Sequence, residues 1–294
     1  MKDILKKLRK YEIRIRKAIN SQMQGDFHSI FKGSGLEFDS VRSYQYGDDV
    51  RTIDWNVSAK GHGTFVKTFI EEKEQTVLFI LDVSASQEIG KEGNQKIDLA
   101  KEIGALLSIS AIKENSQVGL LSFSDQKEKY IKPGKGTKHS YEVLTSIFKL
   151  IPKSKKTDLN YAIKTALGLV KKKAVIFMIS DFIDEDYEHS LKGLARKHDL
   201  IVIQLFDQRE SNMPGLGIIP LIDKESGKTL WVNTSSGSFR NTMDKTYKKN
   251  SSDLEKFCGR NDVNYVAIET GDDYVPKLIK LFRHRNKSSV QRAR

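Results

Sequence analysis

The feature that most constrains the fold is a regular alternation of short apolar runs and longer amphipathic stretches after Glu74. The apolar runs are typical of buried strands, and segments with helical periodicity separate most of them. The expected strands are Gln75–Leu81, Gln117–Phe123, a short edge strand Glu128–Ile131, Ala174–Ser180, Leu200–Phe206 and Tyr265–Ile268. The expected helices are Ile97–Ile112, Ser140–Leu150, Asp158–Lys172, Glu185–Lys197 and Val275–Phe282. Strands that alternate with helices of this length predict an α/β fold, a mostly parallel sheet with helices on both faces.

The rest of the chain predicts four further segments. Residues 1–24 form a basic amphipathic helix, because their apolar side chains recur at steps of three and four. Residues 25–74 are β-rich and divided by glycines, with a strand at Thr64–Ile70. The α/β domain spans 75–284 and carries a β-hairpin insertion at about 211–235, followed by a basic helical stretch at Ser238–Cys258. Residues 285–294 form a basic tail.

The net charge of +12 is concentrated at the two ends of the chain. Residues 1–17 contain eight Lys or Arg and two acidic residues, and residues 277–294 contain seven Lys or Arg and no acidic residue. The body between them is therefore close to neutral, and nucleic acid is not an expected partner. The basic ends leave open a peripheral contact with a membrane surface and equally a purely solubilising role.

The sequence predicts a cytoplasmic protein. The single cysteine, Cys258, excludes a disulfide framework and a cysteine-based zinc site. No apolar run is long enough to span a bilayer, and the N-terminal apolar residues are interleaved with basic ones, unlike those of a signal peptide.

Oxygen-bearing side chains follow the ends of two predicted strands and begin one helix. Asp82, Ser84 and Ser86 follow the first strand, Thr157 precedes a helix, and Asp181 follows the strand Ala174–Ser180. The carboxyl ends of parallel strands meet at one edge of a sheet, where ligands bind. Carboxylates and hydroxyls suit a hard cation such as Mg²⁺, although each residue alone is also an ordinary helix cap or turn residue.

This combination resembles the von Willebrand factor A domain, whose metal-ion-dependent adhesion site uses Asp-x-Ser-x-Ser, a Thr and a later Asp. The resemblance implies that Asp82, Ser84, Ser86, Thr157 and Asp181 bind Mg²⁺, with Mn²⁺ as the alternative ion. It also implies a site that takes an acidic side chain of a partner and breaks no bond. Gln87 stands where many relatives carry Met.

A second set of residues precedes the domain and narrows the resemblance. It is similar to the signature of the domain-of-unknown-function-58 (DUF58) family and comprises Arg42, Tyr44, Gly47, Asp48, Asp49, Arg51, Asp54 and Trp55. Members commonly lie beside a MoxR-type AAA+ ATPase, which implies that ATPase as a partner, together with other von Willebrand A-like proteins. We expect the arginines and carboxylates of this set to form ion pairs that fix the segment to the domain.

The sequence leaves two candidate functions. The first is a non-enzymatic, metal-dependent protein–protein interaction module that acts as an adaptor for the ATPase. The second is a metal-dependent hydrolase or nuclease that uses Asp48, Asp49 and Asp54, with the basic ends on nucleic acid. No phosphate loop, dinucleotide fingerprint, nucleophile elbow or zinc-protease motif is present in the sequence, so other enzyme classes are not expected.

Overall fold

The computed structural model describes residues 37–61, 63–70, 75–91, 93–212 and 214–292. The helix predicted at residues 1–24 lies outside these ranges.

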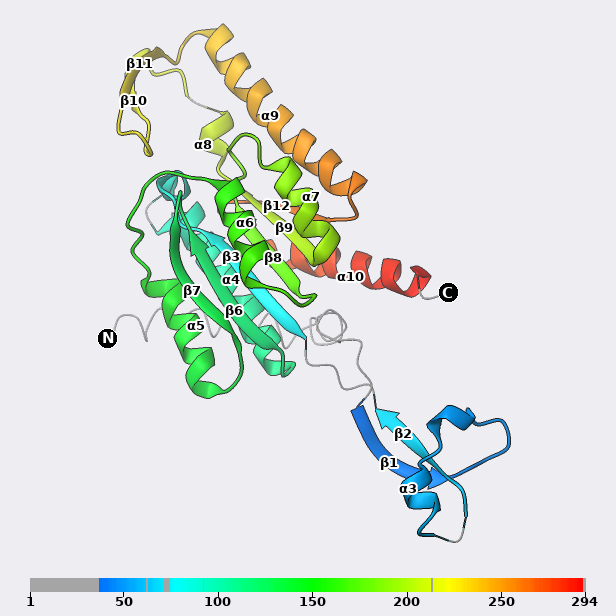
Figure 1. The fold of residues 1–294 in the computed structure, drawn as a ribbon. Helices are drawn as coiled ribbons and strands as arrows, with labels where there is room; N and C mark the ends of the chain where they lie inside the picture. Colours follow the sequence, from blue (N-terminus) through cyan, green and yellow to red (C-terminus); the bar gives the residue numbers. More distant parts are fainter. Residues whose placement is uncertain (1–36, 62, 71–74, 92, 213, 293–294) are drawn as a thin grey trace.

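A six-stranded sheet forms the centre of the α/β domain, in the order β12-β9-β8-β3-β6-β7 (Figure 1). All neighbouring strands are parallel except β7, which pairs antiparallel with β6 at one edge. The predicted fold class is therefore confirmed. The strands are β3 (Thr76–Asp82), β6 (Gln117–Phe123), β7 (Lys127–Gly134), β8 (Val175–Ser180), β9 (Asp199–Phe206) and β12 (Asn264–Glu269).

Helices cover both faces of this sheet, because its central strands bury side chains on both sides. Val77 and Phe79 of β3 face one apolar cluster, and Leu78 and Ile80 face the other. The first cluster is closed by α4 (Lys96–Lys113), α5 (Thr137–Lys149) and α10 (Tyr274–Arg292). The second is closed by α6 (Leu159–Leu169), α7 (Glu188–Lys197) and α9 (Gly237–Arg260). The final helix continues beyond its predicted end at Phe282, into residues expected to form a tail.

The insertion after β9 begins with a short helix, α8 (Gln208–Ser211), and continues as the predicted hairpin of β10 (Ile218–Ile222) and β11 (Thr229–Asn233). Figure 1 shows this hairpin beyond the end of the sheet at which β3 finishes. The insertion therefore lies at the same edge as the predicted metal ligands.

The DUF58-like segment folds as an antiparallel pair, β1 (Glu37–Ser43) and β2 (Phe65–Ile70), with two short helical turns between the strands. These turns are η2 (Val50–Thr52) and α3 (Trp55–Ser58). Three short elements complete the fold: η3 (Ala85–Glu88) and the two-residue strands β4 (Gly90–Lys91) and β5 (Asn94–Gln95). Among the described residues, no helix is both long and apolar enough to cross a membrane.

Candidate metal centre at the carboxyl edge of the sheet

The first loop of the site is ordered by the carboxylate that begins it. Asp82 is the last residue of β3, and its Oδ1 accepts a hydrogen bond from the backbone N–H of Ser84 at 3.0 Å. The chain then forms the single turn η3, which brings the hydroxyls of Ser84 and Ser86 within 3.0 Å of each other. The Asp-x-Ser-x-Ser motif thus presents a carboxylate and two hydroxyls from one compact turn.

Asp82 is fully buried. Its Oδ2 accepts hydrogen bonds from the hydroxyl of Ser180 at 2.6 Å and from the side-chain amide of Gln87 at 3.3 Å. Burial, reinforced by the negative charge of Asp181, nevertheless raises the pKa of Asp82 to about 7. A nearby cation would stabilise the anionic form of this buried carboxylate.

The loop that carries Thr157 is fastened to the first loop and to the sheet. The N–H of Ala85 donates to the carbonyl of Lys155 at 2.9 Å, which joins the two loops directly. On the other side, the carboxylate of Glu128 accepts from the N–H groups of Lys153 and Ser154 at 2.9 and 3.0 Å. Thr157 therefore lies beside the Asp-x-Ser-x-Ser turn. Its neighbour Asp158 serves as the N-cap of α6.

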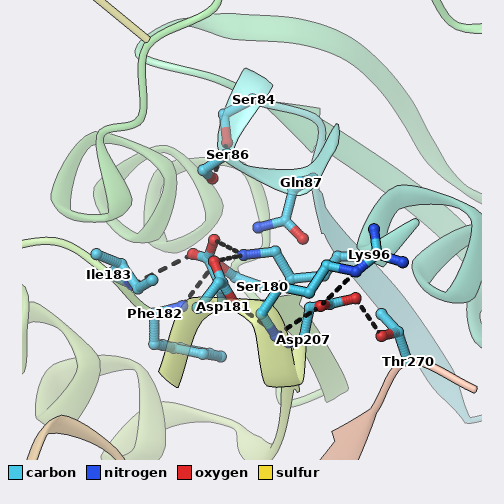
Figure 2. Close-up of polar contacts among 12 residues, drawn as sticks. Ser84, Ser86, Gln87, Lys96, Ser180, Asp181, Phe182, Ile183, Asp207 and Thr270 are labelled. Atoms are coloured by element: carbon cyan, nitrogen blue, oxygen red, sulfur yellow. Dashed lines mark hydrogen bonds and ion pairs between the residues drawn. The ribbon is translucent and has the colours of Figure 1, made fainter. Parts of the chain in front are cut away.

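Asp181 follows β8 and is held from several sides. Phe182 adopts a left-handed backbone conformation (φ 57°), and the turn lets Asp181 Oδ1 accept from the N–H of Ile183 at 3.2 Å. Asp181 Oδ2 accepts from the ammonium group of Lys96 at 2.8 Å. Figure 2 shows Ser84 and Ser86 on one side of Asp181 and Lys96 on another.

Lys96 is a residue that sequence reasoning missed. Its side chain is completely buried at the start of α4, and its ammonium also donates to Glu210 of α8 at 2.6 Å. Burial opposes the charge, but the carboxylates of Asp181 and Glu210 outweigh it, and the pKa of Lys96 is raised. One sequence signal was present, because Lys96 lies three residues before Leu99 and seven before Ile103, on the buried face of α4.

Glu225 is the second residue that sequence reasoning missed. It belongs to the turn of the β10–β11 hairpin, 68 residues after Thr157. Its carboxylate accepts the Thr157 hydroxyl at 2.6 Å through Oε1 and the Thr157 N–H at 3.2 Å through Oε2. The hairpin therefore touches one of the predicted metal ligands.

The donor set fits a hard cation. Hydroxyl and carboxylate oxygens from three loops lie at one edge of the sheet, and the pKa of one of the carboxylates, Asp82, is raised. In the same turn, Gln87 Oε1 is buried without a hydrogen-bond partner. No group of three or more His, Cys, Asp or Glu side chains suited to a metal exists in the described part of the chain. The predicted set is of another type, because it combines only two carboxylates with three hydroxyl groups.

Comparison with known families identifies the chain. A family model described as "Protein of unknown function DUF58" matches residues 40–253. The chain belongs to the DUF58 family. An uncharacterized protein of Mycobacterium tuberculosis is 23% identical over 286 residues, which cover 96% of this chain and 90% of that protein.

Solved structures with a similar fold have low sequence identity. BatB from Bacteroides thetaiotaomicron, a conserved hypothetical protein, aligns over 72% of this chain and 99% of its own, with 14% identity and a TM-score of 0.45. Proximal thread matrix protein 1 from the mussel byssus, solved with a zinc-occupied MIDAS motif, aligns over 71% of this chain and 47% of its own. Its identity is 15% and its TM-score 0.41.

The DUF58 signature residues have local structural roles. Arg42 donates two hydrogen bonds of 2.7 Å to the carboxylate of Asp48, which also accepts from the N–H of Gln45 at 2.8 Å. These bonds, with the guanidinium first, lower the pKa of Asp48 to about 2. The expected ion pair is therefore present, but it lies within the segment and does not fix the segment to the α/β domain. Gly47 supplies the left-handed conformation (φ 104°) of the turn between the partners.

The other signature residues cap turns or face solvent. Asp49 caps η2 and Asp54 caps α3, where it accepts the N–H groups of Asn56 and Val57 at 3.0 and 3.2 Å. The Tyr44 N–H donates to the carbonyl of Thr64 at 2.8 Å, which joins the residue after β1 to the residue before β2. Arg51 and Trp55 are exposed. The carboxylates of this segment thus have their partners within the segment: nearby backbone N–H groups, Arg42 for Asp48 and Lys67 for Asp54.

Proposed function

We propose that this DUF58 protein is a non-enzymatic, metal-dependent protein-binding module. Asp82, Ser84, Ser86, Thr157 and Asp181 would hold Mg²⁺, or Mn²⁺ in its place, and an acidic side chain of a partner would complete the ion's shell. The partner that the family resemblance suggests is a MoxR-type AAA+ ATPase, and other von Willebrand A-like proteins are further candidates.

One observation carries the proposal: a buried carboxylate of raised pKa, Asp82, begins a turn that brings the hydroxyls of Ser84 and Ser86 together, and a hydrogen bond joins that turn to the loop of Thr157. The three hydroxyls of this set are neutral, so they could bind a cation without adding negative charge to it. The hydrogen bond from the Ala85 N–H to the Lys155 carbonyl holds the two loops together. A site built this way favours capture of an external carboxylate over bond cleavage.

The surface around Thr157 suits an acidic protein. Lys153, Lys155 and Lys156 precede Thr157 and are exposed, and Lys224 and Lys228 flank Glu225 on the hairpin. Their shared positive charge would attract an acidic surface and steer its approach.

Exposed apolar side chains accompany these lysines. Ile183 lies two residues after Asp181 and is 48% exposed, and Tyr161 lies four residues after Thr157 and is 40% exposed. Ile151, at the start of the same loop, is 85% exposed. These side chains would give a partner apolar contacts beside a polar, charged rim.

The alternative hypothesis, a metal-dependent hydrolase or nuclease, has no such support. Asp49 and Asp54 cap helical turns and Asp48 pairs with Arg42, so these carboxylates have structural partners. No observation favours a second metal site there.

The test is capture of the partner by the purified, tagged chain from its native lysate, in Mg²⁺ and again in EDTA. We expect an AAA+ ATPase to be retained in Mg²⁺, lost in EDTA and lost with Asp82→Asn. Asp54→Asn is the matched control and should retain it. ATPase capture that is indifferent to both EDTA and Asp82→Asn would contradict a metal-dependent interface.

A further inference from the structure

We propose that a pocket at the amino edge of the sheet binds a small molecule that bears a phosphate group, with His198 and Arg285 as its principal contacts. The pocket has a volume of about 740 Å³, within the range of small-molecule sites. Its walls combine charged groups with the apolar side chains of Leu200 and Val263, as such sites do. The pocket is separate from the candidate metal centre, so this inference goes beyond the proposed function and does not depend on it.

The topology places the pocket opposite the candidate metal centre. Its walls include the first residues of β9 and β12, Asp199 and Asn264. β8, β9 and β12 are parallel, so their amino ends lie at one edge of the sheet and their carboxyl ends at the other. Figure 1 shows the β10–β11 hairpin at the carboxyl edge. α10 begins just after β12 and returns along the sheet, and Arg285, about three helical turns from its first residue, reaches the amino edge.

The first observation is the imidazole of His198, the residue that follows α7. His198 lines the pocket and is only 3% exposed, and neither of its ring nitrogens has a hydrogen-bond partner in the described part of the chain. Burial, together with the charge of Lys197, lowers the pKa of His198 to about 4, so the ring is neutral near pH 7. A neutral imidazole has one N–H donor and one acceptor nitrogen. Because buried polar atoms are normally paired, this ring favours a polar group placed against it.

The second observation is a donor group of Arg285 that the protein does not use. Its Nη2 pairs with the carboxylate of Asp199 in the wall of the same pocket. Its Nη1 is buried and has no hydrogen-bond partner among the residues that the structure describes. A guanidinium can hold one oxyanion with each of its amino groups, and hydrogen bonds of this kind are among the strongest in proteins. Arg285 is therefore held by Asp199 and can donate to a second oxyanion.

The third observation is the excess of positive charge around the pocket. Among the described residues, four cationic side chains and two carboxylates line it: Lys173, Lys192, Arg196, Arg285, Asp199 and Asp262. The pair of Asp199 with Arg285 balances one charge of each sign, so the remaining charge is positive. A phosphate monoester carries nearly two negative charges near pH 7 and presents three acceptor oxygens. It can pair with several cationic groups at once, whereas a carboxylate has one charge and two oxygens.

The end of α9 beside the pocket is capped by its own chain. The Asn261 N–H donates to the carbonyls of Phe257 and Cys258, both at 3.2 Å, and the Val263 N–H donates to the carbonyl of Cys258 at 3.0 Å. The side-chain amide of Asn261 also donates to Phe257, at 2.8 Å. These bonds reduce the negative potential that carbonyls at a helix C-terminus would direct at an anion.

The test titrates the full, metal-free chain with inorganic phosphate and follows backbone amide NMR shifts, with chloride keeping the ionic strength constant. We expect saturable shifts at residues 198–200 and 261–264. His198→Phe removes both ring nitrogens and keeps an aromatic ring, and Arg285→Lys keeps a charge beside Asp199 but loses the second amino group. Each should weaken phosphate binding about tenfold, as loss of one hydrogen bond to a charged group does. Unchanged amide shifts away from the pocket would show that both variants are folded.

The matched control is Arg209→Lys. Arg209 also lies beside an aspartate, Asp207, but at the carboxyl edge of the sheet, so this variant should bind phosphate as the wild type does. Acetate should bind about tenfold more weakly than phosphate, because its single charge pairs with fewer cationic groups. Absence of saturable shifts in the wild type, or a phosphate affinity that either pocket variant leaves unchanged, would refute the site. Equal affinities for acetate and phosphate would refute the phosphate class of ligand.

Discussion

Asp48 and Asp82 are aspartates of the same chain that titrate at opposite ends of the carboxylate range. The guanidinium of Arg42 and the N–H of Gln45 lower the pKa of Asp48 to about 2, in a segment open to solvent. Burial and the charge of Asp181 raise the pKa of Asp82 to about 7. The partners of Asp48 lie within six residues of it, whereas Ser180, which donates to Asp82, lies 98 residues away.

The difference separates a structural carboxylate from one that we propose is held for a ligand. Asp48 is stabilised as an anion by neighbours that the local turn supplies, and it needs nothing further. Asp82 is held where the anion is costly although three protein groups donate to it. Carboxylates whose pKa is raised by burial and a neighbouring charge are found at functional sites, and we propose that a cation completes this one.

The largest expected effect comes from replacing Lys96, whose buried ammonium group lies between two carboxylates. Lys96→Met leaves the carboxylates of Asp181 and Glu210 without their shared ammonium, and breaking a buried pair in this way costs about 3–5 kcal/mol. Urea denaturation should show a correspondingly lower free energy of unfolding.

The control for Lys96→Met is Lys67→Met in the DUF58 segment. Lys67 is exposed and lies 3.7 Å from Asp54, so its removal should leave the unfolding midpoint of the domain unchanged. If the two substitutions lowered the free energy of unfolding equally, the proposed difference between the two regions would be wrong.

The next effect is the pH dependence of metal binding. The pKa of Asp82 is raised above its unfolded value, so in the absence of metal the folded state holds its proton more tightly than the unfolded chain does. The free energy of unfolding should therefore fall as the pH rises from about 4 to about 7. Metal binding needs the anion, so Mn²⁺ affinity should decrease about tenfold for each pH unit below 7.

Thermal unfolding with and without Mg²⁺ tests this pH dependence of metal binding. The metal should raise the melting temperature at pH 8 and have little effect at pH 5. A stabilisation by Mg²⁺ that is the same at both pH values would show that Asp82 does not take part in binding.

A smaller effect is expected from single hydroxyl ligands. Ser86→Ala removes one of the two hydroxyls of the Asp-x-Ser-x-Ser turn, and Mn²⁺ binding should weaken about tenfold. Asp49→Asn, a helix cap of the DUF58 segment, should leave the affinity unchanged. Calorimetry on the two variants distinguishes the loss of a metal-binding hydroxyl from a general effect of replacing a polar residue.

The smallest effect should come from the exposed ion pair. Asp48→Asn should increase hydrogen exchange at the turn of residues 44–48 and alter neither the global unfolding nor Mn²⁺ binding. Because the pKa of Asp48 is lowered, its pair with Arg42 is complete above about pH 4 and is lost as the pH falls through about 2. Carboxyl NMR shifts followed over this range would report it, and a midpoint near 4 would refute the pair.

Much of the fold could be predicted from local patterns. The apolar run Gln117–Phe123 is β6 at its predicted bounds, and both strands of the hairpin lie inside the insertion predicted at about 211–235. The helical turn α3 was missed, because its four residues have no amphipathic periodicity and depend on the cap from Asp54. The extent of α10 beyond Phe282 was missed because basic residues were read as a tail, although they are also good helix formers.

The candidate site was only half visible in the sequence. Asp82, Ser84 and Ser86 form a contiguous motif, and the topology brings the loop of Thr157 and the end of β8 to the same edge. Lys96 and Glu225 carry no motif. Their roles arise from pairings across 85 and 68 residues, which only the packed fold specifies.

The most direct test of the account is a calorimetric titration of the metal-free chain with Mn²⁺ at pH 7.5, beside Asp82→Asn. Asparagine can keep the N–H bond from Ser84, and the hydroxyl of Ser180 and the amide of Gln87 can turn to accept from it, so this variant should stay folded. We predict one Mn²⁺ per wild-type chain and none in Asp82→Asn, with equal circular dichroism spectra. Equal Mn²⁺ binding by both proteins would contradict a metal centre at this edge of the sheet.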